Sequence, residues 1–295
     1  MPGTAYSIIL DNLKKDSDFH ALLDEKISPT EYFMRINEKK NKLLHGDFNE
    51  DMLNLSARMP PDPEKYVDTL LEMLFEDGVI PSKTYNKEVY DETEKIFSHN
   101  FNHRNNKTFI FPEESRLLFA LADITKPRKI AFMGSYYAFW ALWVLPALPI
   151  GSTVWLMDID TNSQALATEN INNLSLAEEV EIIQIGEDAI KYIKNIMDLD
   201  WIVLDAEGPK YGVDDDMIDK AIYYPMIREG YASLREGGLM IAHNILLNNT
   251  TNSEYISEKI RWNEKMFSKF LPFLQKNFQS FLHFESTEGV GIAKK

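Results

Sequence analysis

A glycine and a carboxylate stand where this sequence could bind a nucleoside. Gly134 follows the apolar run 130–133, and Asp158 follows the apolar run 154–157. Both runs have the composition of buried parallel strands. A glycine lets the backbone turn tightly beneath a ligand. A carboxylate at the end of the next strand can accept both hydroxyls of a ribose, because open parallel sheets bind ligands outside the carboxyl ends of their strands. The pattern predicts a nucleoside-binding βαβ unit; alternatively, Asp158 only caps a helix.

The glycine pattern separates two classes of cofactor. Positions 134–139 read Gly-Ser-Tyr-Tyr-Ala-Phe, whereas a dinucleotide fingerprint needs three glycines to admit a pyrophosphate. NAD and FAD are therefore not expected, and S-adenosylmethionine (SAM), which has no phosphate, is the predicted cofactor. Tyr136 and Tyr137 could stabilise its sulfonium through an aromatic face. They could equally form the buried start of a helix.

Composition excludes several partners. The chain has 295 residues, 44% of them hydrophobic, a net charge of −15 and no cysteine. The acidic balance argues against nucleic acid, whose binding depends on Lys and Arg. Without cysteine there is no disulfide, thiol nucleophile or thiolate metal site. The start of the sequence has no basic segment followed by an apolar one, and no apolar run reaches about 18 residues. We therefore expect a cytoplasmic protein with a small-molecule substrate and no membrane partner.

The elements that would position these residues fall into two parts. Residues 1–107 have apolar residues spaced by three or four, broken at positions 60–63, where Pro63 should begin a new helix. From residue 128 onward, strands near 129–133, 153–158, 180–184, 200–205 and 238–242 alternate with helices near 136–147, 162–174, 188–197 and 216–234. A helix near 254–276 and an antiparallel pair at 278–284 and 289–293 follow. The sequence predicts a helical N-terminal domain (1–107) and an α/β domain (108–295) with a doubly wound, mostly parallel sheet.

This order of elements resembles the class I SAM-dependent methyltransferases, whose seven-stranded sheet ends in an antiparallel strand. Within that class, residues from about 109 to 295 are similar to the catechol and caffeoyl-CoA O-methyltransferase family. The resemblance implies O-methylation of a small molecule. We expect the N-terminal domain to wall the acceptor pocket and to contribute to a homodimer. The residues that the resemblance places at the cofactor are Gly134, Ser135, Tyr136, Asp158, Ile159, Glu187, Asp188, Ala189 and Asp205.

In that family the ends of strands four and five carry metal ligands, which correspond here to Asp205, His243 and Asn244. Oxygen donors suit a hard divalent cation. His243 stands where the family usually has aspartate, and an imidazole favours a transition metal over magnesium. The alternative is a site without metal, in which Asp205 positions the SAM ammonium or a substrate hydroxyl.

Methyl transfer also needs a base for the proton of the acceptor, and we expect His243 first, with Lys210 and Glu114 as further candidates. The family's lysine after the strand-four aspartate has no match at the same spacing, and Lys210 lies two residues later; it could be a solvated surface charge. Phe132 and Ala138 also depart from the family pattern, at its strand-one acid and second turn glycine.

A second resemblance, carried by residues 129–135, 158–160 and 109–112, is to nicotianamine synthase. It implies transfer or cyclisation of the 3-amino-3-carboxypropyl group of SAM instead of methyl transfer. Phe132 and Ala138 leave a third possibility open, an inactive scaffold with the SAM fold.

Overall fold

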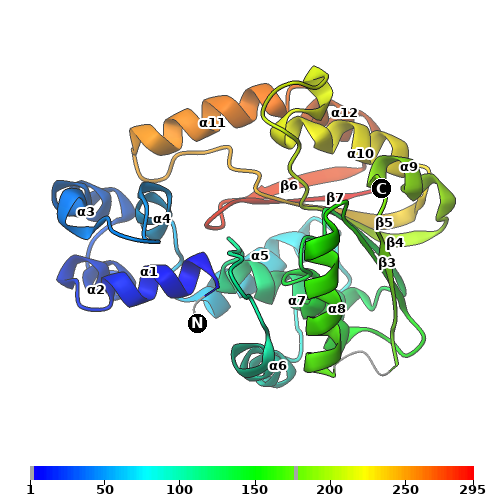
Figure 1. Ribbon diagram of the computed structural model, residues 1–295, viewed down its shortest axis with the longest axis horizontal. Coiled ribbons are helices and arrows are strands. Elements are labelled where there is room, and N and C mark those ends of the chain that lie inside the picture. Colours follow the sequence, from blue (N-terminus) through cyan, green and yellow to red (C-terminus); the bar gives the residue numbers. More distant parts are fainter. Residues whose placement is uncertain (1–2, 176–178) are drawn as a thin grey trace.

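The computed structural model describes residues 3–175 and 179–295. Its centre is a seven-stranded sheet with the strand order β3-β2-β1-β4-β5-β7-β6 (Figure 1). The strands are β1 (Lys129–Met133), β2 (Thr153–Met157), β3 (Glu181–Ile185), β4 (Leu199–Leu204), β5 (Leu234–His243), β6 (Ser280–Phe284) and β7 (Val290–Lys294). Strands β1 to β5 are parallel, and β7 is antiparallel to both β5 and β6. The predicted α/β fold class, with its antiparallel terminal pair, is confirmed.

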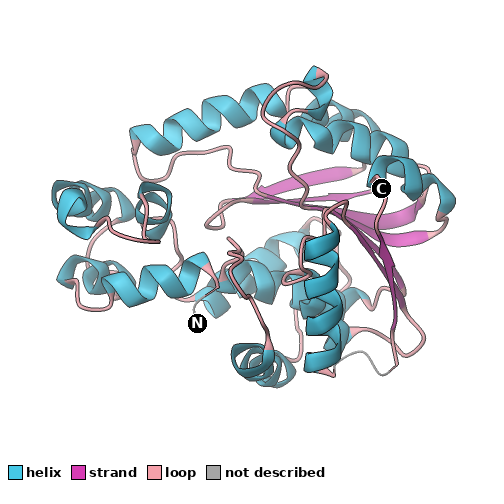
Figure 2. Ribbon diagram, viewed as in Figure 1, coloured by secondary structure: helices cyan, strands magenta, loops and turns pink. Residues whose placement is uncertain are grey.

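Helices cover both faces of the sheet (Figure 2). They are α1 (Ala5–Leu13), α2 (Ser17–Leu23), α3 (Pro29–Leu43), α4 (Glu50–Ser56), α5 (Pro63–Glu76), α6 (Lys87–Asn100), α7 (Pro112–Thr125), α8 (Thr161–Leu174), α9 (Ala189–Tyr192), α10 (Tyr223–Gly230), α11 (Glu254–Met266) and α12 (Phe270–Asn277). Short 3₁₀ helices lie at η1 (Ala141–Ala147), η2 (Ile193–Asn195), η3 (Asp215–Met217) and η4 (Asp219–Ile222).

Successive side chains of β1 pack against different sets of helices on the two faces of the sheet. Ile130 and Phe132 share a core with residues of α5, α6, α7 and α8, whereas Ala131 and Met133 share one with residues of α9, α10 and α12. Successive side chains of a strand point to opposite faces, so a continuous apolar run indicates a strand that is buried on both.

The crossover between β1 and β2 differs from the predicted α-helix at 136–147. Tyr136 and Ala138 have positive φ angles of 49° and 66°, and only a 3₁₀ helix, Ala141–Ala147, follows them. Pro146 lies inside this segment and has no N–H to donate. Ala138 occupies the left-handed conformation that a glycine would adopt without strain. The resembled family has a glycine at this position.

Two other predicted helices are interrupted. The segment predicted at 216–234 forms η3, η4 and then α10, with Asp219 at a φ of 46°. The segment predicted at 254–276 forms α11 and α12, which are separated at residues 267–269. Pro63 is at the start of α5, as predicted, where the side chain of Asp62 accepts a hydrogen bond from the backbone N–H of Lys65.

The hydrophobic cores divide the chain near residue 60. Apolar residues of α1–α4, together with Phe111, form one cluster. Helices α5 and α6 instead share the core of the sheet through residues such as Leu71 and Phe97. A division near residue 107 therefore does not follow the cores, because helical periodicity alone does not tell which neighbour a helix packs against. Within the described residues, no helix is long and apolar enough to cross a membrane.

Candidate active site

The loop after β1 approaches the loop after β4 very closely. Gly134 has a φ of 87°, and a Cβ atom on it would overlap the Cα and N atoms of Ala206. The backbone N–H groups of Gly134 and Ser135 donate to the carbonyl oxygen of Met157 at 2.9 and 3.0 Å. The ends of β1, β2 and β4 are thus fixed together at the edge where open parallel sheets bind ligands.

Asp158 lies at this edge, directly after β2. Its Oδ2 accepts from the N–H of Tyr136 at 2.8 Å, and its Oδ1 accepts from the N–H of Asp160 at 2.9 Å. A carboxylate has about four lone-pair positions, so each oxygen retains one. Burial raises the pKa of Asp158, and the two backbone hydrogen bonds oppose that shift. The remaining acceptor capacity matches the two hydroxyls of a ribose.

Four further residues predicted to lie at the cofactor follow the paired strands β2 and β3. The side chain of Ile159 is 75% exposed, Glu187 is exposed and Ala189 is buried. Asp188 accepts a hydrogen bond from the N–H of Ile190 and so begins α9. Ile159 thus offers an apolar surface to a flat ring, whereas the role of Asp188 in the described structure is that of a helix cap.

The two tyrosines after Gly134 and Ser135 have different environments. Tyr136 is 41% exposed and donates from its hydroxyl to Asn106 Oδ1 at 3.1 Å. Tyr137 is fully buried, with its hydroxyl 2.9 Å from His103 Nδ1. Of the two, only Tyr136 can present an aromatic face to a ligand.

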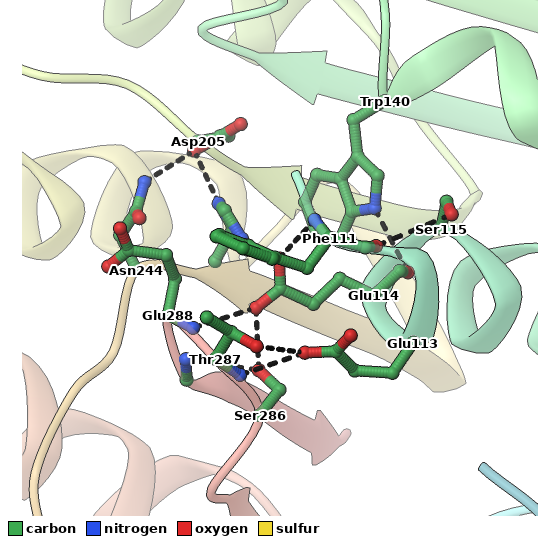
Figure 3. A network of polar contacts seen from close by, with 12 residues as sticks. Phe111, Glu113, Glu114, Ser115, Trp140, Asp205, Asn244, Ser286, Thr287 and Glu288 are labelled. Atoms are coloured by element: carbon green, nitrogen blue, oxygen red, sulfur yellow. Dashed lines mark hydrogen bonds and ion pairs between the residues drawn. The ribbon is translucent and has the colours of Figure 1, made fainter. Parts of the chain in front are cut away.

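A buried polar network lies at the ends of β4 and β5 (Figure 3). His243 is 1% exposed, and its ring packs against Trp140 with the centroids 4.9 Å apart. Its Nε2 lies 2.9 Å from Glu114 Oε2, and its Nδ1 lies 3.2 Å from Asp205 Oδ1. The Nδ2 of Asn244 donates to the same Asp205 oxygen at 3.1 Å. The structure therefore brings together Glu114, Asp205, His243 and Asn244 from three distant segments.

Glu114 is the centre of this network. Its Oε2 also accepts from the N–H of Phe111 at 3.0 Å, and its Oε1 accepts from Ser286 Oγ at 2.7 Å and from the N–H of Glu288 at 2.9 Å. Four donors surround a carboxylate whose side chain is 0% exposed. A carboxylate in this position anchors the turn between β6 and β7 and the start of α7.

The two carboxylates determine the charge of His243. Burial disfavours the charged ring, but the negative charges of Glu114 and Asp205, and hydrogen bonds to both, outweigh it and raise the pKa of His243 to about 10. Because an ionised carboxylate can only accept, each ring nitrogen is a donor. His243 is an imidazolium at neutral pH.

The model of the O-methyltransferase family matches residues 82–264, more than half of the chain. The chain belongs to the O-methyltransferase family. Among solved structures, a Podospora anserina methyltransferase bound to S-adenosylhomocysteine has a TM-score of 0.50 and 13% identity, over 85% of this chain and 98% of its own. A Geobacter sulfurreducens methyltransferase has a TM-score of 0.47 and 19% identity over 76% of this chain and 94% of its own. A Bacillus cereus O-methyltransferase in complex with S-adenosylhomocysteine has a TM-score of 0.46 and 17% identity over 79% of this chain and 100% of its own. A comparison with curated proteins gave no match.

This O-methyltransferase is accordingly a SAM-dependent enzyme that methylates a small molecule. The family match begins at residue 82, earlier than the resemblance seen in the sequence, and so includes α6. Methyl transfer is favoured over transfer of the 3-amino-3-carboxypropyl group, because the similarity to nicotianamine synthase is not supported.

The residues at the predicted metal site of this O-methyltransferase do not fit a divalent cation. Each nitrogen of His243 lies within hydrogen-bonding distance of a carboxylate oxygen, so neither nitrogen points to an open position where a metal could lie. Asp205 Oδ1 already accepts from two N–H donors. Within residues 3–175 and 179–295, no group of three His, Cys, Asp or Glu side chains could hold a metal ion. Only Asp205 Oδ2 and Asn244 Oδ1 remain as oxygen donors, and the His243 ring that lies beside them between two carboxylates already occupies the place of a cation.

The same geometry bears on the predicted bases of the O-methyltransferase. A protonated His243 cannot accept a proton, and Glu114 is enclosed by donors. Lys210 is exposed on the loop after β4. The structure thus brings Glu114 and His243 together in one network and leaves Lys210 outside it, whereas the side chain of Asp205 is 23% exposed.

Sequence reasoning missed Lys220, a buried lysine of η4. Its Nζ donates to the carbonyl oxygen of Ala206 at 3.0 Å and lies 3.4 Å from the hydroxyl of Tyr223. That hydroxyl donates to the carbonyl oxygen of His243 at 2.9 Å. Lys220 and Tyr223 therefore tie the loop after β4 to the end of β5. Proximity in sequence favoured Lys210, and only the tertiary fold reveals Lys220.

Proposed function

We propose that the enzyme methylates a hydroxyl of a small molecule, with Asp158 holding the ribose of SAM and Asp205 facing the acceptor. The observation that carries this assignment is that the two carboxylates flank the close contact between Gly134 and Ala206. Asp158 follows β2, and the N–H of Asp205 donates to the carbonyl oxygen of Met133, the last residue of β1, at 3.1 Å. The cofactor would then lie across the ends of β1 and β2, with its reactive side towards β4.

The residues present fit SAM. The tight turn at Gly134 leaves no side chain between the cofactor and the ends of the strands, and Asp158 retains one lone pair on each oxygen. Tyr136 would contribute its aromatic face and Ile159 an apolar contact. Gly134, Ser135, Tyr136, Asp158 and Ile159 form the proposed cofactor site.

When bound, SAM supplies a methyl carbon that is already activated by the sulfonium. The protein then chiefly aligns the acceptor oxygen and removes its proton. Oδ2 of Asp205 has no hydrogen-bond partner among the described residues, and it is the only oxygen of that side chain that can accept the acceptor hydroxyl. Oδ2 of Asp205 would accept the proton that the acceptor hydroxyl loses on methylation.

His243, Asn244 and Glu114 act as positioning residues in this proposal. Two N–H donors fix Oδ1 of Asp205 and so aim Oδ2. Glu114 in turn fixes the His243 ring. A general base needs both correct geometry and a free lone pair, and Asp205 is the member of the network that has both.

We infer that the N-terminal helices wall the acceptor pocket. Arg58, just after α4, donates to the carbonyl oxygens of Ser286 and Thr287 in the turn between β6 and β7. The same turn donates to Glu114. This contact supports the predicted role of the N-terminal part in acceptor selection. The homodimer and the cytoplasmic location stay predictions.

Methyl transfer is tested by the coproduct. The purified enzyme is incubated with SAM and a panel of small phenols and alcohols, and the nucleoside products are identified by mass spectrometry. We expect S-adenosylhomocysteine and an acceptor that is heavier by one methylene unit. In Asp205→Asn, the loss of the base should lower kcat by about 10²- to 10⁴-fold with the affinity for S-adenosylhomocysteine unchanged. Methylthioadenosine would instead support the aminobutanoate reaction, and an Asp205→Asn variant with the wild-type kcat would contradict the role of Asp205.

A further inference from the structure

A fully buried imidazole ring with a carboxylate on each side lies at the ends of β4 and β5. The His243 ring is 1% exposed, has Glu114 Oε2 and Asp205 Oδ1 within hydrogen-bonding distance of its two nitrogens, and packs against the ring of Trp140 at a tilt of 45°. Burying an isolated charge is costly unless it is paired and hydrogen-bonded. Here each charged N–H has its own carboxylate, Glu114 on one side and Asp205 on the other, so the ring is fully satisfied.

This cation does what a metal ion would do in the same place. It attracts Asp205, and together with Asn244 it fixes the orientation of the carboxylate that faces the acceptor. Unlike a metal ion, it is covalently part of β5 and cannot be lost. Its donors point to fixed oxygens, so it directs Asp205 by hydrogen bonds and has no open position for a substrate oxygen.

Glu114 completes the arrangement. Without a positive ring, the carboxylates of Glu114 and Asp205 would face each other across the site in an environment of low polarity. Glu114 is held by the backbone N–H groups of Phe111 and Glu288 and by Ser286, so it cannot move away. The negative partner of His243 is therefore built into the fold, and a positive ring between the two carboxylates relieves their mutual repulsion.

On the basis of the function proposed above, we propose that His243 replaces the divalent cation of metal-dependent O-methyltransferases, and that this enzyme transfers methyl groups without metal. The imidazolium and a divalent cation would occupy the same position beside Asp205 and could not be present together. Exchange of His243 for a carboxylate should therefore create a cation site, because Asp205, Asn244, Glu114 and the new carboxylate would offer hard oxygen donors around an uncompensated negative charge.

The test compares metal binding by the wild type and by His243→Asp, using calorimetric titration with MgCl₂ and MnCl₂ in the full-length chain. The wild type should show no saturable binding up to millimolar cation. His243→Asp should bind Mn²⁺ at least about tenfold more tightly than the wild type, and its melting temperature should rise with Mn²⁺ concentration, since a ligand that binds only the folded state stabilises it. His243→Asn is the matched control, because asparagine is similar in size to aspartate but adds no negative charge. Its affinity for Mn²⁺ should be close to that of the wild type.

The wild-type enzyme also gives a test that does not depend on whether the variants fold. Formation of S-adenosylhomocysteine should be unchanged after treatment with EDTA. Loss of product with EDTA and its return with Mg²⁺ or Mn²⁺, micromolar metal binding by the wild type, or a folded His243→Asp variant that binds no cation would each overturn the proposal. Absence of the product both with and without metal would instead count against the proposed function, so the two failures are distinguishable.

Discussion

Replacing Arg58 with alanine should lower the free energy of unfolding by about 3–5 kcal/mol, the range for removing one partner of a buried ionic network. The guanidinium is 1% exposed, and its N–H groups donate to three backbone carbonyl oxygens, to Thr250 Oγ1 and to Glu285 Oε2. Its removal leaves the buried carbonyl oxygens of Ser286 and Thr287 without this donor, and each such group costs about 1–3 kcal/mol. The contact joins the N-terminal helices to the turn between β6 and β7.

Equilibrium unfolding in urea measures this effect. Arg35→Ala is the matched control, because Arg35 also forms ion pairs, with Asp18 and Glu31, but its side chain is 46% exposed. Exposed ion pairs contribute only about 0–1 kcal/mol, so the control should retain nearly the full stability. Arg58→Lys should also lose much of the stability, since an ammonium cannot reproduce the planar set of donors of a guanidinium. Equal effects of Arg58→Ala and Arg35→Ala would contradict the account of the network.

Gly134→Ala should be destabilised by about 2–5 kcal/mol, because overpacking and a left-handed backbone both oppose it. The new methyl group would overlap the backbone of Ala206, and the φ of 87° is unfavourable for any residue with a Cβ. Relief of the overlap would move the loop after β1 away from the loop after β4. Affinity for S-adenosylhomocysteine should fall together with stability.

Gly151→Ala separates the two causes. Gly151 has a φ of 76°, similar to that of Gly134, but a Cβ there would have no atom within 4 Å. It should therefore show only the cost of the backbone conformation, about 1–2 kcal/mol. Thermal melting of the two variants gives the comparison. Equal melting temperatures would mean that the close approach of Gly134 to Ala206 has no steric consequence.

Local features of the sequence were enough to predict the parallel strands of the sheet. The apolar runs before Gly134 and Asp158 identified two adjacent parallel strands, because buried strands have a continuous apolar pattern. Asp158 was assigned from its place at the end of the second strand. The crossover was predicted incorrectly, since the positive φ angles of Tyr136 and Ala138 depend on how the loop packs.

The polar network could not be predicted in the same way. Glu114 and His243 were each candidates, but their contact joins residues 129 positions apart. The charge of His243 follows from that contact. The residue therefore changes from a possible base or metal ligand in the sequence analysis to a fixed cation in the structure. Lys220 was missed for a similar reason, because its carbonyl partner lies on a different loop. Pairing across distant segments decides the chemistry of these side chains.

The most direct test of the central claim is a calorimetric titration of S-adenosylhomocysteine into the wild type, Asp158→Ala and Asp160→Ala. The Asp158→Ala variant would lose two charge-assisted hydrogen bonds to the ribose, each worth about 1.5–3 kcal/mol. Its affinity for S-adenosylhomocysteine should therefore fall by about 100-fold or more. Asp160 lies two residues away, but its carboxylate accepts from Asn162 N and Ser163 Oγ at the start of α8. Asp160→Ala should cost about 1 kcal/mol of stability and keep the wild-type affinity. Binding by a folded Asp158→Ala variant within twofold of the wild type, or no binding by the wild type at millimolar ligand, would contradict the cofactor site.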